Sequence, residues 1–135
     1  MIFETDKDRY NEKAAQRRLE RYGYEVIKTG TLCPWDLTLS LGGEPHAIVE
    51  FKARNKLWDP LKVDAHKLRE LARHARDRRV KPIFMISVPG PEYWFVEINL
   101  DWPTSTFTRK RNAQYRQETP DEVFEIPKRN WKKLE

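Results

Sequence analysis

The feature that most constrains the fold of this chain is an alternating run that leads through a turn into an apolar run. Residues 36–41, "DLTLSL", place Leu37, Leu39 and Leu41 on one face of an extended strand. The "GGEP" that follows is a turn signal, and "HAIVEFK" at 46–52 is a second strand. The pattern predicts an antiparallel hairpin, which commits the chain to a sheet.

Charged residues interrupt this hairpin at one end. Glu50 and Lys52 are two residues apart, so both project from the same face of their strand. A turn near 42–45 puts Asp36 opposite residue 50 or 51, but a shift of one residue would move it to the other face. Two interpretations stay open. The pair is an edge-strand salt bridge worth ~0–1 kcal/mol, or it belongs to a chemical site that includes Asp36.

The remaining pattern predicts an α/β sandwich with a mixed sheet. We expect a helix that starts near Thr5 or Asp6 and ends at Gly23, followed by a strand at 24–28. A second helix is predicted from Pro60, with Asp59 as its cap, to Arg79, and two strands follow in "PIFMISV" and "YWFVEINL". Residues 103–122, "PTSTFTRKRNAQYRQETPDE", are predicted to be loop-like, and one last short element is expected in "VFEIPKRNWKKLE" at 123–135. We therefore expect a core at 1–102 and a basic C-terminal extension at 103–135 packed on the same domain.

Composition narrows the class of protein. The chain has 135 residues, 35% of them charged, a formal net charge of +5 and a pI of about 9.4, which suits a polyanionic partner. No apolar run approaches the roughly 20 residues of a membrane span, and no secretory signal is visible. Cys33 is the single cysteine, and His46 and His74 lack zinc-ligand spacing. We expect a cytoplasmic protein with no membrane contact and no small-molecule cofactor.

Acidic residues suggest what the charged end of the hairpin does. Two carboxylates as close as Asp36 and Glu50 repel each other unless a cation lies between them, and Mg²⁺ or Mn²⁺ prefers such oxygen ligands. Lys52 would point to the same place and could hold a phosphate oxygen or orient a water. On the first helix, Glu12 falls within about 60° of the stripe that contains Ala15 and Leu19. It therefore either faces inward as a third acid or is exposed on a rotated helix.

These residues together resemble the PD-(D/E)xK nuclease superfamily over roughly residues 8–99. The resemblance rests on "PWD", on "EFK" in the next strand and on the upstream helix with its Glu. It is closest to the small Holliday junction resolvases of archaeal and phage or virus type. It implies a restriction-endonuclease-like α-β-β-β-α-β sandwich with a central mixed sheet. It also implies Asp36 and Glu50 as metal ligands with the Phe51 carbonyl, Lys52 as the catalytic lysine and Glu12 as the helix acid. The sequence departs from the family pattern at Trp35, which stands where the motif is usually "PD".

Basic residues outside the hairpin are candidates for nucleic-acid binding. Four cationic side chains and a histidine gather on one side of the second predicted helix, and "TRKR" lies in the extension. A basic helix face is also common as a plain solvated surface, and His66 has the alternative of being an ordinary surface histidine. The candidates are Lys62, His66, Arg69, Arg73, Arg76, Arg109, Lys110 and Arg111.

The resemblance and the residues together favour a Mg²⁺- or Mn²⁺-dependent endonuclease that hydrolyses DNA phosphodiesters. By resemblance, its substrate would be branched or junction DNA, and paired nicks would call for a homodimer. If it is a phage or virus protein, it would act in the host cytoplasm. Two rivals stay open: a restriction, repair or homing-type nuclease on linear duplex, and a non-catalytic nucleic-acid-binding module with the same fold.

Overall fold

A computed structural model describes residues 6–30, 32–110 and 118–135 of the protein. Its elements, in chain order, are α1 (Asp6–Arg21), β1 (Glu25–Lys28), β2 (Leu37–Leu41), β3 (Glu44–Ala53), β4 (Leu61–Asp64), α2 (Ala65–Arg78), β5 (Lys81–Val88), β6 (Glu92–Glu97), β7 (Thr104–Lys110), β8 (Glu118–Ile126), the 3-10 helix η1 (Lys128–Asn130) and β9 (Lys132–Lys133).

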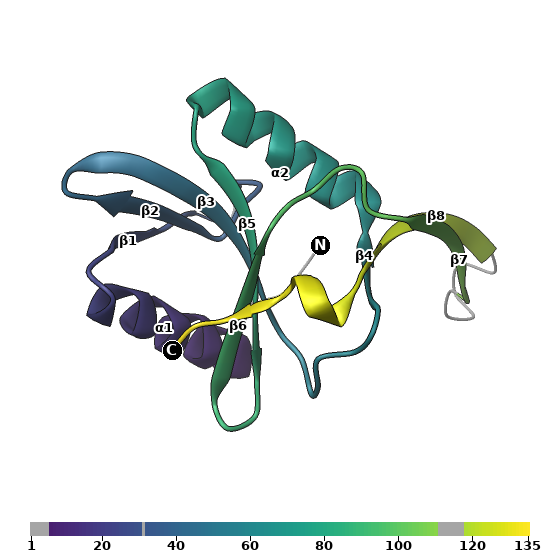
Figure 1. Ribbon diagram of the computed structural model, residues 1–135, viewed down its shortest axis with the longest axis horizontal. Helices are drawn as coiled ribbons and strands as arrows, with labels where there is room; N and C mark the ends of the chain where they lie inside the picture. Colours follow the sequence, from purple (N-terminus) through teal and green to yellow (C-terminus); the bar gives the residue numbers. More distant parts are fainter. Residues whose placement is uncertain (1–5, 31, 111–117) are drawn as a thin grey trace.

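Two sheets organise these elements. The central sheet has the order β1-β2-β3-β5-β6-β9, with β3 parallel to β5 and the other neighbours antiparallel. The second sheet, β4-β8-β7, is antiparallel. Helices α1 and α2 lie on opposite sides of the central sheet, and the second sheet extends beyond α2 (Figure 1). The predicted sandwich with a mixed sheet is therefore confirmed.

Each face of the central sheet buries its own apolar cluster, because successive side chains of β3 point to opposite faces. Ala47, Val49 and Phe51 pack under α1 with Leu37 and Leu39. Ile48 packs on the other side against α2 and the second sheet. Glu50 follows Ile48 on that side and is the one charged residue among the buried residues described. The buried carboxylate of the sheet therefore lies on its α2 side.

A β-bulge sets the pairing of the β2–β3 hairpin. The two-residue turn at Gly42 and Gly43, both with positive φ, pairs Leu41 with Glu44 and Ser40 with Pro45. The register then shifts, and Leu39 pairs with Ala47, so His46 is the extra residue on β3. Without this bulge the pairing would carry Asp36 to Val49 and to the α1 face. With it, the pairs end at Leu37 with Val49, and Asp36 comes just before β2, where its carboxylate accepts a hydrogen bond from the Phe51 amide.

The second helix begins later than its periodicity predicts. Residues 61–64 form β4 and pair with β8, and the helix starts at Ala65 with the Asp64 carboxylate accepting a hydrogen bond from the His66 amide at 2.9 Å. Neither Pro60 nor Asp59 opens the helix, so that prediction was wrong. Leu61 has the right spacing for the helical stripe, but it is buried as a strand residue, because distant pairing with β8 outweighs the local preference.

Residues 104–110 and 118–122 are not the loop that their polar composition predicts, whereas the element expected after 122 is present. They form β7 and the start of β8, and Phe124 and Ile126 are fully buried. Trp102 packs edge-on against Phe124 with ring centroids 6.1 Å apart. These few apolar residues close the core over α2, while the polar side chains between them face outward. No helix in the described ranges is long and apolar enough to cross a membrane.

Candidate active site

Asp36 is fixed by the backbone on both sides of it. Its amide donates to the Val49 carbonyl at 2.9 Å, and its own carbonyl accepts a hydrogen bond from the Thr29 amide at 3.0 Å. Its Oδ2 accepts a 2.8 Å hydrogen bond from the Phe51 amide. The carboxylate is therefore anchored to β3 beside Glu50 and retains one oxygen for another partner.

Trp35, the residue that departs from the family pattern, holds this segment against α2. Its ring is buried and lies 5.4 Å from the His74 ring, and the Arg78 guanidinium lies over it at 4.6 Å. Its Nε1 donates to Thr38 Oγ1 at 2.9 Å. The extra aromatic residue thus docks the Asp36 loop onto the helix instead of projecting into the site.

Glu50 is the buried charge of the site. Its side chain is 3% exposed, and its Oε1 lies 2.9 Å from Lys67 Nζ and 3.4 Å from Lys52 Nζ. Lys52 comes from the same strand, whereas Lys67 reaches over from α2. Two carboxylates and two ammonium groups therefore meet on the α2 side of the sheet, and their formal charges balance.

The pKa of Glu50 shows how closely these charges are coupled. Burial and then repulsion from Asp36 raise this pKa above 4.5, and the two lysines only partly offset the rise. Burial tends to lower the pKa of Lys67, but close contact with Glu50 and attraction to Glu50 and Asp36 outweigh burial and raise it. Asp36 and Glu50 are therefore near enough to repel, and each benefits from a cation.

The donor set fits a hard divalent cation. Mg²⁺ is commonly held by one or two carboxylates, with water and substrate phosphate completing its shell. Asp36 and Glu50 would supply the carboxylates. The amide of Phe51 points towards Asp36, and in an extended strand the carbonyl of a residue points to the same edge as its amide, so the Phe51 carbonyl is available as well. Mg²⁺ or Mn²⁺ is the ion that suits these oxygen ligands.

Glu12 does not join this set in the structure. It lies on α1, which covers the other face of the sheet, and its carboxylate is 3.7 Å from Lys28 Nζ. Its side chain is 14% exposed, so the predicted inward orientation is right. Within the described ranges, no three His, Cys, Asp or Glu side chains gather closely enough to hold one metal ion. The predicted third acid therefore faces inward without reaching Asp36 and Glu50.

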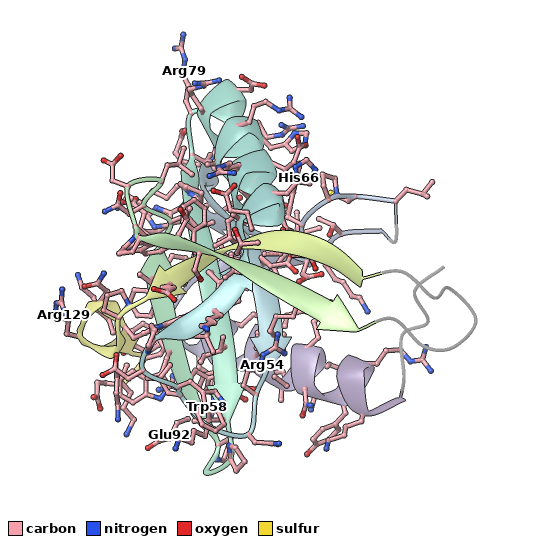
Figure 2. The ribbon with its side chains drawn as sticks, turned by 90° about the vertical axis from the view of Figure 1, so that its right-hand side faces the viewer. Arg54, Trp58, His66, Arg79, Glu92 and Arg129 are labelled. Atoms are coloured by element: carbon pink, nitrogen blue, oxygen red, sulfur yellow. The ribbon has the colours of Figure 1, made fainter. Side chains whose placement is uncertain are left out.

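A cavity of about 530 Å³ opens beside Glu50 and Lys52. Its walls come from β3, from the start of α2 and from the second sheet, which crosses in front of the central sheet (Figure 2). Leu68, Phe84 and Val123 contribute apolar surface. The basic residues at this cavity are Lys52, Arg54, Lys62 and Lys67. Asp64 and Asp121 line the cavity as well as Glu50, so its four cationic side chains exceed its three carboxylates by one formal charge.

Lys67 is the member of the site that the sequence analysis missed. We singled out His66 on the same helix, but its side chain is exposed at the first turn of α2 (Figure 2). Lys67 lies one helical turn before the buried Leu71, so it borders the stripe that faces the sheet. That spacing was the available signal. A lysine beside an apolar stripe is common on helices that cover no site, so the signal was weak.

The other predicted DNA-binding residues lie on α2, on β4 and in the extension. Arg69, Arg73 and Arg76 keep helical spacing with His66 on the exposed side of α2. Arg69 pairs with Glu122 and lies over the Phe124 ring, and Arg73 pairs with Glu70 and Asp77, so protein carboxylates already compensate both. Lys62 is on β4 and so leaves the predicted helix face. Arg111 and the side chains of Arg109 and Lys110 lie outside the described residues, and DNA binding by this set stays a prediction.

Comparison with known proteins bears on the fold. The structure is similar to that of Archaeoglobus fulgidus Hjc, a Holliday junction resolvase from an archaeal hyperthermophile, with a TM-score of 0.63 and 18% sequence identity. The similarity covers 91% of this chain and 94% of that one. No protein-family model and no curated protein matches the sequence. The chain has the fold of an archaeal Holliday junction resolvase, which confirms the sandwich that the resemblance implied.

Proposed function

We propose that the protein is a metal-dependent endonuclease that hydrolyses phosphodiester bonds in DNA, with branched DNA as its substrate class. One observation carries the proposal: the Asp36 carboxylate is anchored to the Phe51 amide beside the buried Glu50, and Lys52 Nζ lies 3.4 Å from the Glu50 carboxylate. This set lies on the fold of a resolvase. A structural pair of Glu50 and Lys52 would not need a second carboxylate that raises the pKa of the buried Glu50.

The residues divide the chemistry between them. Asp36, Glu50 and the Phe51 carbonyl would hold the divalent cation, which polarises a phosphate oxygen and lowers the pKa of an attacking water. Lys52 has a side chain that is 40% exposed, so its ammonium can reach a phosphate oxygen or orient that water. Water adds to phosphorus, and the P–O bond to the leaving sugar oxygen breaks. The products are one phosphate end and one hydroxyl end.

Charge supports DNA as the substrate. The chain carries a formal net charge of +5, and four cationic side chains line the cavity next to Glu50. Such a surface attracts the phosphate backbone without reading its sequence, and its affinity falls steeply with salt. We therefore expect binding to depend on DNA shape and ionic strength more than on base sequence.

The test is cleavage of a synthetic four-way junction and of its separate linear arms. We expect Mg²⁺ to support cutting of the junction, EDTA to abolish it, and Asp36→Asn and Lys52→Ala to reduce it severely. If either variant cuts as well as the wild type, the assignment of the site is wrong. Circular dichroism of each variant controls for folding.

The same experiment separates the rivals. Equal cutting of the linear arms would favour a linear-duplex nuclease. DNA binding with no cutting in Mg²⁺ or Mn²⁺ would favour a non-catalytic module. A resolvase that makes paired nicks needs two sites, so we also propose a homodimer, and sedimentation equilibrium measures the assembly directly.

A further inference from the structure

Lys67 contacts the site in a way that the proposed chemistry does not use. Its Nζ is 2.9 Å from Glu50 Oε1, closer than that of Lys52 at 3.4 Å. It comes from α2, outside the hairpin, and lines the same cavity as Arg54 and Lys62. Two ammonium groups thus share one carboxylate that the proposed function assigns to a cation.

The formal charges of the four site residues cancel only while no cation is bound. Asp36, Glu50, Lys52 and Lys67 together carry no net formal charge. With a dication on Glu50 the local charge would be +2, and Lys67 would face a like charge at a few ångströms. A phosphodiester anion in the cavity would lower that excess. The cation and Lys67 therefore compete for Glu50, while the cation and DNA support each other.

The Lys67 ammonium can also reach a second position, inside the cavity. Its side chain is 42% exposed, and four methylene groups give its ammonium a long reach. The cavity beside it has room for a nucleotide phosphate and is lined by further cations. An ammonium released from Glu50 therefore finds an anionic partner within reach once a DNA strand occupies the cavity.

We propose that Lys67 couples cation binding to DNA binding: it occupies Glu50 in the free protein and transfers to a DNA phosphate when a cation takes its place. The inference rests on the proposed function, because it assumes that Asp36 and Glu50 hold the cation. The coupling is reciprocal, so DNA must tighten cation binding by the same factor by which the cation tightens DNA binding. The free protein then binds a cation weakly, because Lys67 already pairs with Glu50.

The first experiment titrates the DNA-free protein with Mn²⁺ at pH 8 and measures the unbound ion by electron paramagnetic resonance. Lys67→Gln removes the charge but keeps a hydrogen-bond donor for Glu50, and we expect it to bind Mn²⁺ about tenfold more tightly. Lys67→Arg keeps the charge and should bind Mn²⁺ like the wild type. Lys62→Gln lines the same cavity without contacting Glu50 and should also match the wild type.

The second experiment measures junction affinity by fluorescence anisotropy in Ca²⁺ and in EDTA. We expect the gain from Ca²⁺ to be about fivefold or more smaller in Lys67→Gln than in the wild type. If the Gln variant does not fold by circular dichroism, Lys67→Met, which has a similar length and no charge, replaces it in both experiments.

Asp36→Asn distinguishes a failure of the proposed cation site from a failure of the role proposed for Lys67. If it binds Mn²⁺ as tightly as the wild type, the cation site of the proposed function is wrong. If it loses Mn²⁺ while Lys67→Gln binds no more tightly than the wild type, the site stands and the role of Lys67 is overturned. Tighter binding in Lys67→Gln alone, with Lys67→Arg and Lys62→Gln unchanged, supports the coupling.

Discussion

The two faces of the central sheet treat a buried carboxylate differently. On the α2 face, Glu50 is 3% exposed, is repelled by the nearby Asp36 and contacts Lys52 and Lys67. On the α1 face, Glu12 is 14% exposed and pairs with Lys28 on an edge strand. Both positions would be costly without cationic partners. Only the first puts a second acid and an open cavity beside the carboxylate, and that difference separates a candidate site from a structural ion pair.

Cleavage rates give the sharpest comparison of the two faces. We expect Asp36→Asn or Glu50→Gln to lower the single-turnover rate about 10³-fold, because each removes a ligand of the cation. Glu12→Gln should lower it about tenfold or less, since Glu12 lies outside the pair. Equal losses for Glu12→Gln and Asp36→Asn would show that the two faces act as one site.

The free energy of unfolding should respond differently to a buried and to an exposed residue of the loop before Asp36. Trp35→Ala should lower the free energy of unfolding by about 3–5 kcal/mol, because the ring fills the space between the loop and α2. Leu32→Ala in the same loop is the matched control. Leu32 is fully exposed, and its loss should cost less than about 0.5 kcal/mol. Urea denaturation measures both, and a large cost at Leu32 would contradict the packing described.

Deletion of His46 tests whether the bulge itself is needed to hold Asp36. Without His46, the pair of Ser40 with Pro45 is followed directly by the pair of Leu39 with Ala47, so the turn and the alignment of Leu37 and Leu39 are both kept. We therefore expect the variant to fold and to bind Mn²⁺ like the wild type. A folded variant that loses Mn²⁺ as Asp36→Asn does would show that the local bend and twist of the bulge are required to place Asp36.

The pH dependence of stability should differ in sign between a buried and an exposed glutamate. Folding raises the pKa of Glu50, so its contribution is fully present below about 4.5 and is lost as pH rises through the folded-state pKa. The wild type should therefore lose stability relative to Glu50→Gln as pH rises from 4.5 to 8. Arg69 lowers the pKa of the exposed Glu122, so the difference from Glu122→Gln should run the opposite way. Slopes of the same sign would contradict the assignment.

The smallest effect concerns DNA affinity. Lys62→Ala should weaken binding and reduce the slope of log affinity against log salt by about 0.9, the amount for one phosphate contact. Arg69→Ala should change the slope less, because Glu122 already compensates that charge. Anisotropy over a series of salt concentrations measures both slopes. A larger change for Arg69→Ala would show that its ion pair opens on DNA.

The parts of the fold that depend on residues close together in the sequence could be predicted. The alternation of Leu37 and Leu39 and the charges at Glu50 and Lys52 were enough to predict a hairpin with a charged end. The register of the hairpin could not be predicted, because a strand with a bulge at His46 and a regular strand show the same sequence pattern. The family resemblance named Asp36 and Glu50 as one site where periodicity alone left two alignments open.

Distant pairing explains the errors. Leu61 continues the helical stripe of α2, and only pairing with β8, far along the chain, makes it a strand residue. The residues of β7 and the start of β8 are polar enough to suggest a loop, and only the pairing of β8 with β7 and β4 makes them strands. Lys67 reached the site through the packing of α2 over β3, which no spacing within the hairpin encodes.

The central claim is that Asp36 and Glu50 hold a divalent cation on the α2 face of the sheet. Crystals soaked in Mn²⁺ test it directly through an anomalous difference map. We expect an anomalous peak bounded by the two carboxylates and the Phe51 carbonyl. A map with no peak there, or with its peak at Glu12 under α1, would contradict it.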